Sequence, residues 1–193
     1  MRLSLRDLRA RLPRRKLWAL LGGAALAASV VAAVPGVASA QTVTAIYLAH
    51  EQSYGMYAQS GVTDQSVIAL TTPPWGTWDA IPMGTTSEDG ISGPGYEFES
   101  ITTSGVYSNL CMQTLFESGL AQLGPCGENG TVFIEVANGG GYLMYSRYFL
   151  NMGIQVALAT YGFDPYGDFQ VYALPAGQLT TGIYYRWAFS PPL

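Results

Sequence analysis

Beyond residue 40 the sequence contains no lysine and only two arginines, Arg147 and Arg186. Twelve acidic residues in the same segment leave it with a formal charge of −10, although the whole chain of 193 residues carries −4. Proteins that bind nucleic acid or an anionic membrane surface need clustered lysine and arginine to displace counterions. We therefore expect this segment to bind neither.

Histidine is nearly absent as well. His50 is the only one, and no G-x-S-x-G motif occurs. Histidine is the side chain used most often for general acid–base catalysis, so the sequence offers few candidates for the base of a hydrolytic triad. Together with the lack of a free cysteine, the scarcity also argues against zinc. The sequence therefore predicts no catalytic residue and favours a protein that is not an enzyme.

The first 40 residues predict a signal peptide that is removed. A basic segment precedes an apolar run at residues 17–34, and an A-x-A cleavage motif ends at Ala40. Cleavage there leaves residues 41–193, which is enough for one domain with a core of its own. We expect this domain to be secreted, with no stable membrane insertion after cleavage.

Two alternatives concern the same leader. About 18 apolar residues are just enough to span a bilayer, so residues 17–34 are also compatible with a membrane anchor. The pair Arg14-Arg15 resembles a twin-arginine export signal, although Pro13 stands where a serine is usual. Export by the twin-arginine route and by the general secretory route both stay open.

Cysteine occurs only twice, at Cys111 and Cys126. In an exported chain two cysteines predict one disulfide. Closing a loop of this length should stabilise the fold by roughly 3 kcal/mol on the chain-entropy model.

The remaining sequence is rich in tyrosine, glycine and threonine and shows no helical hydrophobic stripe. Residues 43–48, 95–101 and 131–136 mix apolar and β-branched residues in strand patterns, and residues 183–189 predict a last strand. Clusters of glycine, proline and asparagine separate such runs. This spacing predicts an all-β domain.

Three units along the chain share a methionine in one strand, a leucine that ends a second strand, and a later aromatic residue. They are Met56, Leu70 and Trp78; Met112, Leu123 and Phe133; and Met144, Leu158 and Phe169. Three such units predict pseudo-threefold symmetry, with the cysteines joining two strands of the middle unit. Trp78 and Phe169 are expected to lie in the core.

Cys111-Met112, the run Leu123-Gly124-Pro125-Cys126 and Phe133 together resemble the ricin-B-type β-trefoil family of lectin-like proteins. The resemblance implies a β-trefoil of three pseudo-repeats, and a β-sandwich or jelly roll is the alternative. The Gln of the family's Gln-x-Trp motif is missing from all three units. Gly124 and Ala159 also replace a sugar-stacking ring, so the family's sugar site does not carry over as it stands.

Two segments that are rich in turn-forming residues interleave aromatic rings with aspartates. Sugars present an apolar face that stacks on rings and hydroxyls that seek carboxylate acceptors. We therefore predict carbohydrate binding at these two turns. Their candidate ligand-binding residues are Trp75, Asp79, Tyr161, Phe163, Asp164 and Tyr166.

Paired carboxylates offer a different chemistry. Glu97 and Glu99 would face the same side of a strand, as the two acids of a glycosidase require, and Glu88-Asp89 lies in a glycine-rich loop. We expect both pairs to be solvated. Either pair could contribute ligands to calcium, but no D-x-D-x-D-G motif is present and no other cofactor or metal is predicted.

These observations predict a secreted, non-enzymatic binding protein, lectin-like, that contacts carbohydrate through aromatic turns. Two other functions stay open. One is an extracellular protein–protein module such as a protease inhibitor, with residues 84–95 as its reactive loop. The other is a small glycosidase that uses Glu97 and Glu99.

Overall fold

A computed structural model describes residues 41–43, 45–49, 51–58, 63–71, 77–102, 104–161 and 169–193. All described residues belong to one compact unit. The predicted signal peptide and His50 therefore lie outside the described residues.

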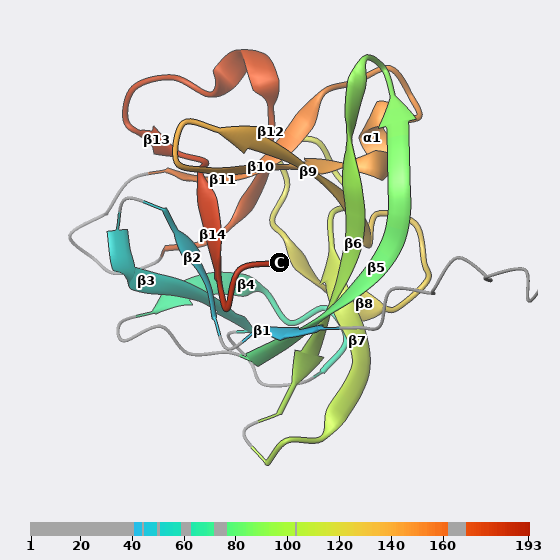
Figure 1. The fold of residues 1–193 in the computed structure, drawn as a ribbon, viewed down its shortest axis with the longest axis vertical. Helices are drawn as coiled ribbons and strands as arrows, with labels where there is room; N and C mark the ends of the chain where they lie inside the picture. The colour runs from blue at the N-terminus through green and yellow to red at the C-terminus, as the bar shows by residue number, and fades with distance from the viewer. Residues whose placement is uncertain are drawn as a thin grey trace, which may run out of the picture. The chain divides into compact units, whose positions relative to one another are not determined.

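The described part is almost entirely antiparallel β-structure, which confirms the all-β prediction (Figure 1). Its fourteen strands are joined by short connections, with one four-residue helix, α1 (Arg147–Leu150), and one 3₁₀ turn, η1 (Ala176–Gln178). The strands are β1 (Gln41–Val43), β2 (Ala45–Leu48), β3 (Glu51–Ala58), β4 (Ile68–Thr71), β5 (Thr77–Glu88), β6 (Ile91–Ile101), β7 (Tyr107–Gln113), β8 (Gln122–Pro125), β9 (Val132–Asn138), β10 (Gly141–Ser146), β11 (Val156–Tyr161), β12 (Tyr172–Pro175), β13 (Ile183–Tyr184) and β14 (Trp187–Ser190).

Strand pairing forms a ring. The hydrogen-bonded path runs from β1 through β5, β6, β9, β10 and β14 to β2, and only residue 44 separates β1 from β2. Alternation along the ring strands explains the core. In β6, for example, Phe98 is fully buried in the main hydrophobic cluster while Glu97 and Glu99 point the other way. Phe98 stacks on Phe189, with ring centroids 5.6 Å apart.

Three hairpins are attached to the ring: β3–β4 on β2, β7–β8 on β6, and β11–β12 on β10. One residue at the start of the second hairpin strand, or directly before it, takes part in each case in a cycle of backbone hydrogen bonds. Ile68 N donates to Ala121 O (2.8 Å), Ala121 N to Val171 O (2.7 Å), and Val171 N to Ile68 O (3.0 Å). These three residues are fully buried, so the three hairpins meet at a dry centre.

The pairing corrects the third of the predicted units. Met56 pairs with Leu70 and Met112 with Leu123. Met144 instead lies in the ring strand β10, and the matching pair on β11 and β12 is Leu158 with Ala173. The prediction was wrong here because it aligned methionines by residue type, whereas strand order places leucine at the third position.

The β5–β6 hairpin, drawn in green in Figure 1, corrects the predicted reactive loop. Residues 84–95 are mostly paired strand, with Thr85 opposite Pro94 and Glu88 opposite Ile91. Asp89 and Gly90 both have positive φ, as a tight two-residue hairpin turn requires. Among the described residues, no helix is long and apolar enough to cross a membrane.

Candidate functional site

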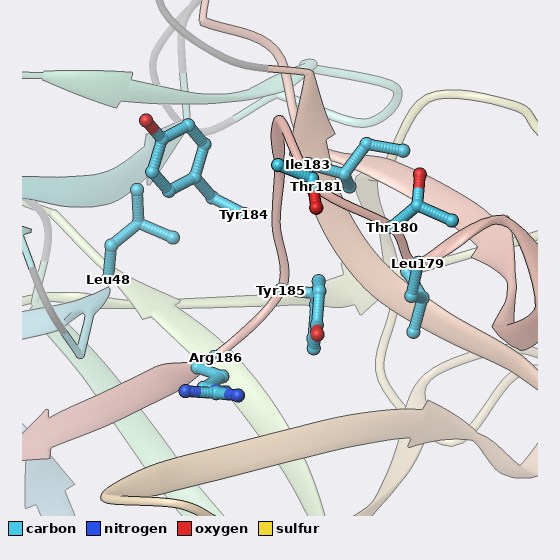
Figure 2. Close-up of a pocket in the computed structure, with 8 residues that line it drawn as sticks. All are labelled: Leu48, Leu179, Thr180, Thr181, Ile183, Tyr184, Tyr185 and Arg186. Carbon is cyan, nitrogen blue, oxygen red and sulfur yellow. The ribbon is translucent and has the colours of Figure 1, made fainter.

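A pocket of about 470 Å³ opens beside the connection between β12 and β14 (Figure 2). In Figure 2, Leu48 and Tyr184 lie on one side and Leu179 and Thr180 on the other, with Tyr185 between them. We call it the Arg186 pocket. It is lined by Leu48, Leu179, Thr180, Thr181, Ile183, Tyr184, Tyr185 and Arg186.

The chain makes this pocket because residues 183–189 do not form one continuous strand, which corrects the sequence prediction. Gly182, with φ +92°, turns the chain, and Ile183 N donates to Thr180 O at 3.1 Å. The short strand β13 then pairs with β11, whereas β14 pairs with β2 and β10. Tyr185 and Arg186 stand at the break between the two strands.

Arg186 contacts its neighbours through its backbone carbonyl and through its guanidinium. Its carbonyl accepts a hydrogen bond from Ala49 N at 2.8 Å. Its guanidinium carbon lies 5.8 Å from the Tyr185 ring centroid, within the range of a cation–π contact. Gly139, in the β9–β10 turn, leaves room on another side of the guanidinium, since a Cβ there would be 3.5 Å from the guanidinium carbon.

The described lining combines rings, hydroxyls and one guanidinium. Of the eight described lining residues, two are tyrosines, two are threonines and one is arginine, while none is an acid, a histidine or a cysteine. Rings supply stacking surface, hydroxyls donate and accept hydrogen bonds, and the guanidinium only donates.

The structure describes only two of the six predicted ligand-binding residues, Tyr161 and Asp79, and they lie on different strands. Trp75, Phe163, Asp164 and Tyr166 lie outside the described residues. Tyr161 is exposed at the end of β11, opposite Ile183 of the pocket, and its ring meets Tyr172 edge-on at 5.1 Å.

Asp79 does not lie in a turn, which corrects the prediction. It is in β5, between Thr42 of β1 and Glu99 of β6, and is 7% exposed. Its burial raises the pKa of its carboxyl above the usual value. Trp78, its neighbour, lies in the core as predicted, with 1% of its surface exposed.

The sequence suggested that Glu97 and Glu99 are solvated, but both are buried. Glu97 Oε1 accepts hydrogen bonds from Gly127 N (3.0 Å) and from Thr131 Oγ1. Both donors lie in the β8–β9 connection, with Thr131 at its end. Glu99 Oε1 accepts one from Asn109 N at 2.7 Å. The pair therefore organises neighbouring backbone, a use that the spacing of two acids on a strand does not reveal.

The predicted disulfide between Cys111 and Cys126 is present and links β7 to the end of β8. Among the described residues, no group of three histidine, cysteine, aspartate or glutamate side chains gathers as metal ligands would. Glu88 Oε1 instead lies 3.7 Å from Nη2 of Arg147. Calcium binding stays the open possibility that the sequence left.

Sequence reasoning missed the Arg186 pocket. Gly182 and the run Tyr184-Tyr185-Arg186, which breaks polar alternation, were the available signals. The two tyrosines and Arg186 were placed in one predicted strand, residues 183–189, which Gly182 precedes.

Comparisons with known proteins give a fold likeness. No family model and no curated protein matches the chain. A solved structure titled as the cytolethal distending toxin of Haemophilus ducreyi is similar, with a TM-score of 0.53 and 11% identity over 78% of this chain and 84% of that chain. Another, titled as the cytolethal distending toxin of Actinobacillus actinomycetemcomitans, has a TM-score of 0.51 and 11% identity over 78% of this chain and 92% of that chain. At such identity these structures are similar to this chain in fold alone.

Proposed function

We propose that residues 41–193 form a β-trefoil that is secreted and binds carbohydrate without catalysing a reaction. One continuous sheet, in place of two facing sheets, supports the trefoil over the sandwich. A ring of strands with three attached hairpins and a three-membered cycle of backbone hydrogen bonds is the arrangement that pseudo-threefold symmetry produces. In this scheme the units correspond through Ile68, Ala121 and Val171.

The symmetry also explains the three closing aromatics. Trp78, Phe133 and Trp187 take corresponding places in β5, β9 and β14, and all three are buried. Trp187 replaces Phe169 as the aromatic of the third unit, because strand pairing and not distance along the chain sets the correspondence.

Sugar binding rests on one observation, the composition of the Arg186 pocket. Pyranose rings have apolar faces that pack on aromatic rings, and their hydroxyls need donors and acceptors around the rim. Tyr184 and Tyr185 provide rings, and Thr180 and Thr181 provide hydroxyls at an exposed edge. A volume of about 470 Å³ is in the range of small-ligand pockets.

A glycan array and a pull-down on insoluble polysaccharides would test the proposal with the purified protein. We expect sugar-dependent retention that Tyr185→Ala abolishes. Tyr107→Ala is the matched control, because Tyr107 is an exposed tyrosine on β7 that does not line the pocket. Lack of retention on every glycan would overturn carbohydrate binding.

The same assay separates this pocket from the aromatic turns of the sequence prediction. Loss of retention in Trp75→Ala, with Tyr185→Ala unchanged, would move the site to the turns. Loss in Tyr185→Ala alone would assign it to the Arg186 pocket.

A further inference from the structure

The two arginines are the only cationic side chains of residues 41–193, apart from His50 when protonated, and each lines a pocket. The second pocket, of about 140 Å³, lies between the β8–β9 connection and the residues that follow β10. We call it the Arg147 pocket. It is lined by Glu128, Asn129, Gly130, Val132, Arg147, Tyr148 and Asn151.

Arg147 has hydrogen-bonding capacity to spare within the described residues. Its Nη2 is 3.7 Å from Glu88 Oε1, a long contact between two side chains that are each about one-third exposed. Its Nε is buried and has no hydrogen-bond partner among the described residues. A buried donor without an acceptor is costly, so an acceptor on a ligand would be favoured there.

The two pockets take corresponding places in the proposed trefoil. Each lies between the connection that leads to a closing aromatic and the end of the first strand of the next unit. Leu48 ends that strand in one case, and Ser146, the residue before Arg147, ends it in the other. Arg186 corresponds to Val132, however, so the arginines enter their pockets from opposite walls. The repeat itself therefore does not account for a guanidinium in both.

Guanidinium groups bind carboxylates and sulfates through paired N–H donors, with a fixed geometry that lysine lacks. The formal charge of −10 works against dense polyanions at long range. An isolated acidic group on an otherwise neutral glycan avoids most of this repulsion and still gains the local contact. The charge distribution thus selects for one acidic sugar at a time.

Building on the proposed function, we infer that the ligand is a glycan with an isolated acidic sugar, whose carboxylate or sulfate pairs with Arg186 while its ring packs on Tyr185. The Arg147 pocket takes a second acidic group more weakly, because it is smaller. A carboxylate and a sulfate both accept the paired N–H donors of a guanidinium, and the titration includes a ligand pair for each.

The test is calorimetric titration of the purified protein with matched ligands. One pair is an oligosaccharide ending in a uronic acid and its methyl ester, and the other is a monosulfated oligosaccharide and its unsulfated form. We expect at least one acidic form to bind about tenfold or more tighter than its neutral partner. Arg186→Gln should remove this preference, Arg186→Lys should restore part of it, and Tyr107→Ala should leave it intact.

The outcomes separate the inference from the proposed function. Equal binding of acidic and neutral partners by the unmodified protein would overturn the inference and leave carbohydrate binding in place. A preference for acid that survives Arg186→Gln would also overturn it. Absence of all glycan binding would overturn both. The comparison of ligands on the unmodified protein remains decisive even if an arginine variant fails to fold.

Discussion

Trp187 and Trp78 make the same contact 109 positions apart in the chain: each indole Nε1 donates to a carbonyl of a hairpin strand. The acceptor is Leu158 O at 2.9 Å for Trp187 and Met56 O at 3.4 Å for Trp78. Leu158 and Met56 are themselves corresponding residues of β11 and β3 in the proposed trefoil. The two tryptophans thus tie ring strands to hairpins in two of its three units.

The shorter of these bonds should be the more important for stability. Trp187→Phe removes a buried donor and ring volume, so we expect a loss of about 2–4 kcal/mol in the free energy of unfolding. Trp78→Phe should cost less, because its hydrogen bond is longer. Urea unfolding of both variants measures the difference, and an equal or reversed order would contradict this account of the contact.

Glu135 should make stability depend on pH. It lies in β9, at the place that Ala80 and Phe189 take in the other units of the proposed trefoil, and burial raises the pKa of its carboxyl to about 8. The folded protein then holds a proton that the unfolded chain releases near pH 4.5. This contribution to stability is complete below pH 4.5 and is lost as the pH rises to about 8, by at most about 1.4 kcal/mol per pH unit.

Thermal unfolding between pH 4 and 9 would measure this dependence. Glu135→Gln should flatten the curve and raise stability above pH 8, whereas Glu117→Gln, at an exposed position, should leave the slope unchanged. A slope that persists in Glu135→Gln would assign the dependence to another group.

Glu97 should matter for the fold and not for catalysis. Glu97→Ala removes the acceptor of Gly127 N and Thr131 Oγ1, and hydrogen bonds to a charged group contribute about 1.5–3 kcal/mol each. We expect a loss of about 2–4 kcal/mol and faster amide exchange at Gly127. Glu117→Ala controls for loss of one acidic charge, and unchanged stability in Glu97→Ala would refute the structural role.

The disulfide should contribute about 3 kcal/mol through the 15-residue separation of Cys111 and Cys126. Guanidinium unfolding of the oxidised protein and of the double variant Cys111→Ala, Cys126→Ala compares the two directly. If the variant were as stable as the oxidised protein, the loop would already be constrained by other contacts.

The sequence was sufficient for features that depend on local patterns. Alternation around Phe98 predicts a strand there, and Trp78 was correctly assigned to the core. The two cysteines predicted their bond because only one pairing exists.

Features that depend on distant partners were missed. Glu97 is buried against hydrogen-bond donors from residues 127 and 131, and the β6 sequence does not predict these distant contacts. The Arg186 pocket exists because β13 pairs with β11 while β14 pairs with β2, so an apparently continuous strand divides. In the proposed trefoil, pairing and not residue type makes Leu158 the counterpart of Met56, so the third unit of the sequence prediction differs for the same reason.

If Tyr185 forms the stacking surface of a sugar site, titration of the purified protein with the best ligand from a glycan array should reveal it. We expect saturable binding that falls at least tenfold in Tyr185→Ala, is recovered in Tyr185→Phe, and is unchanged in Tyr107→Ala. Binding that is equally strong in Tyr185→Ala would contradict it.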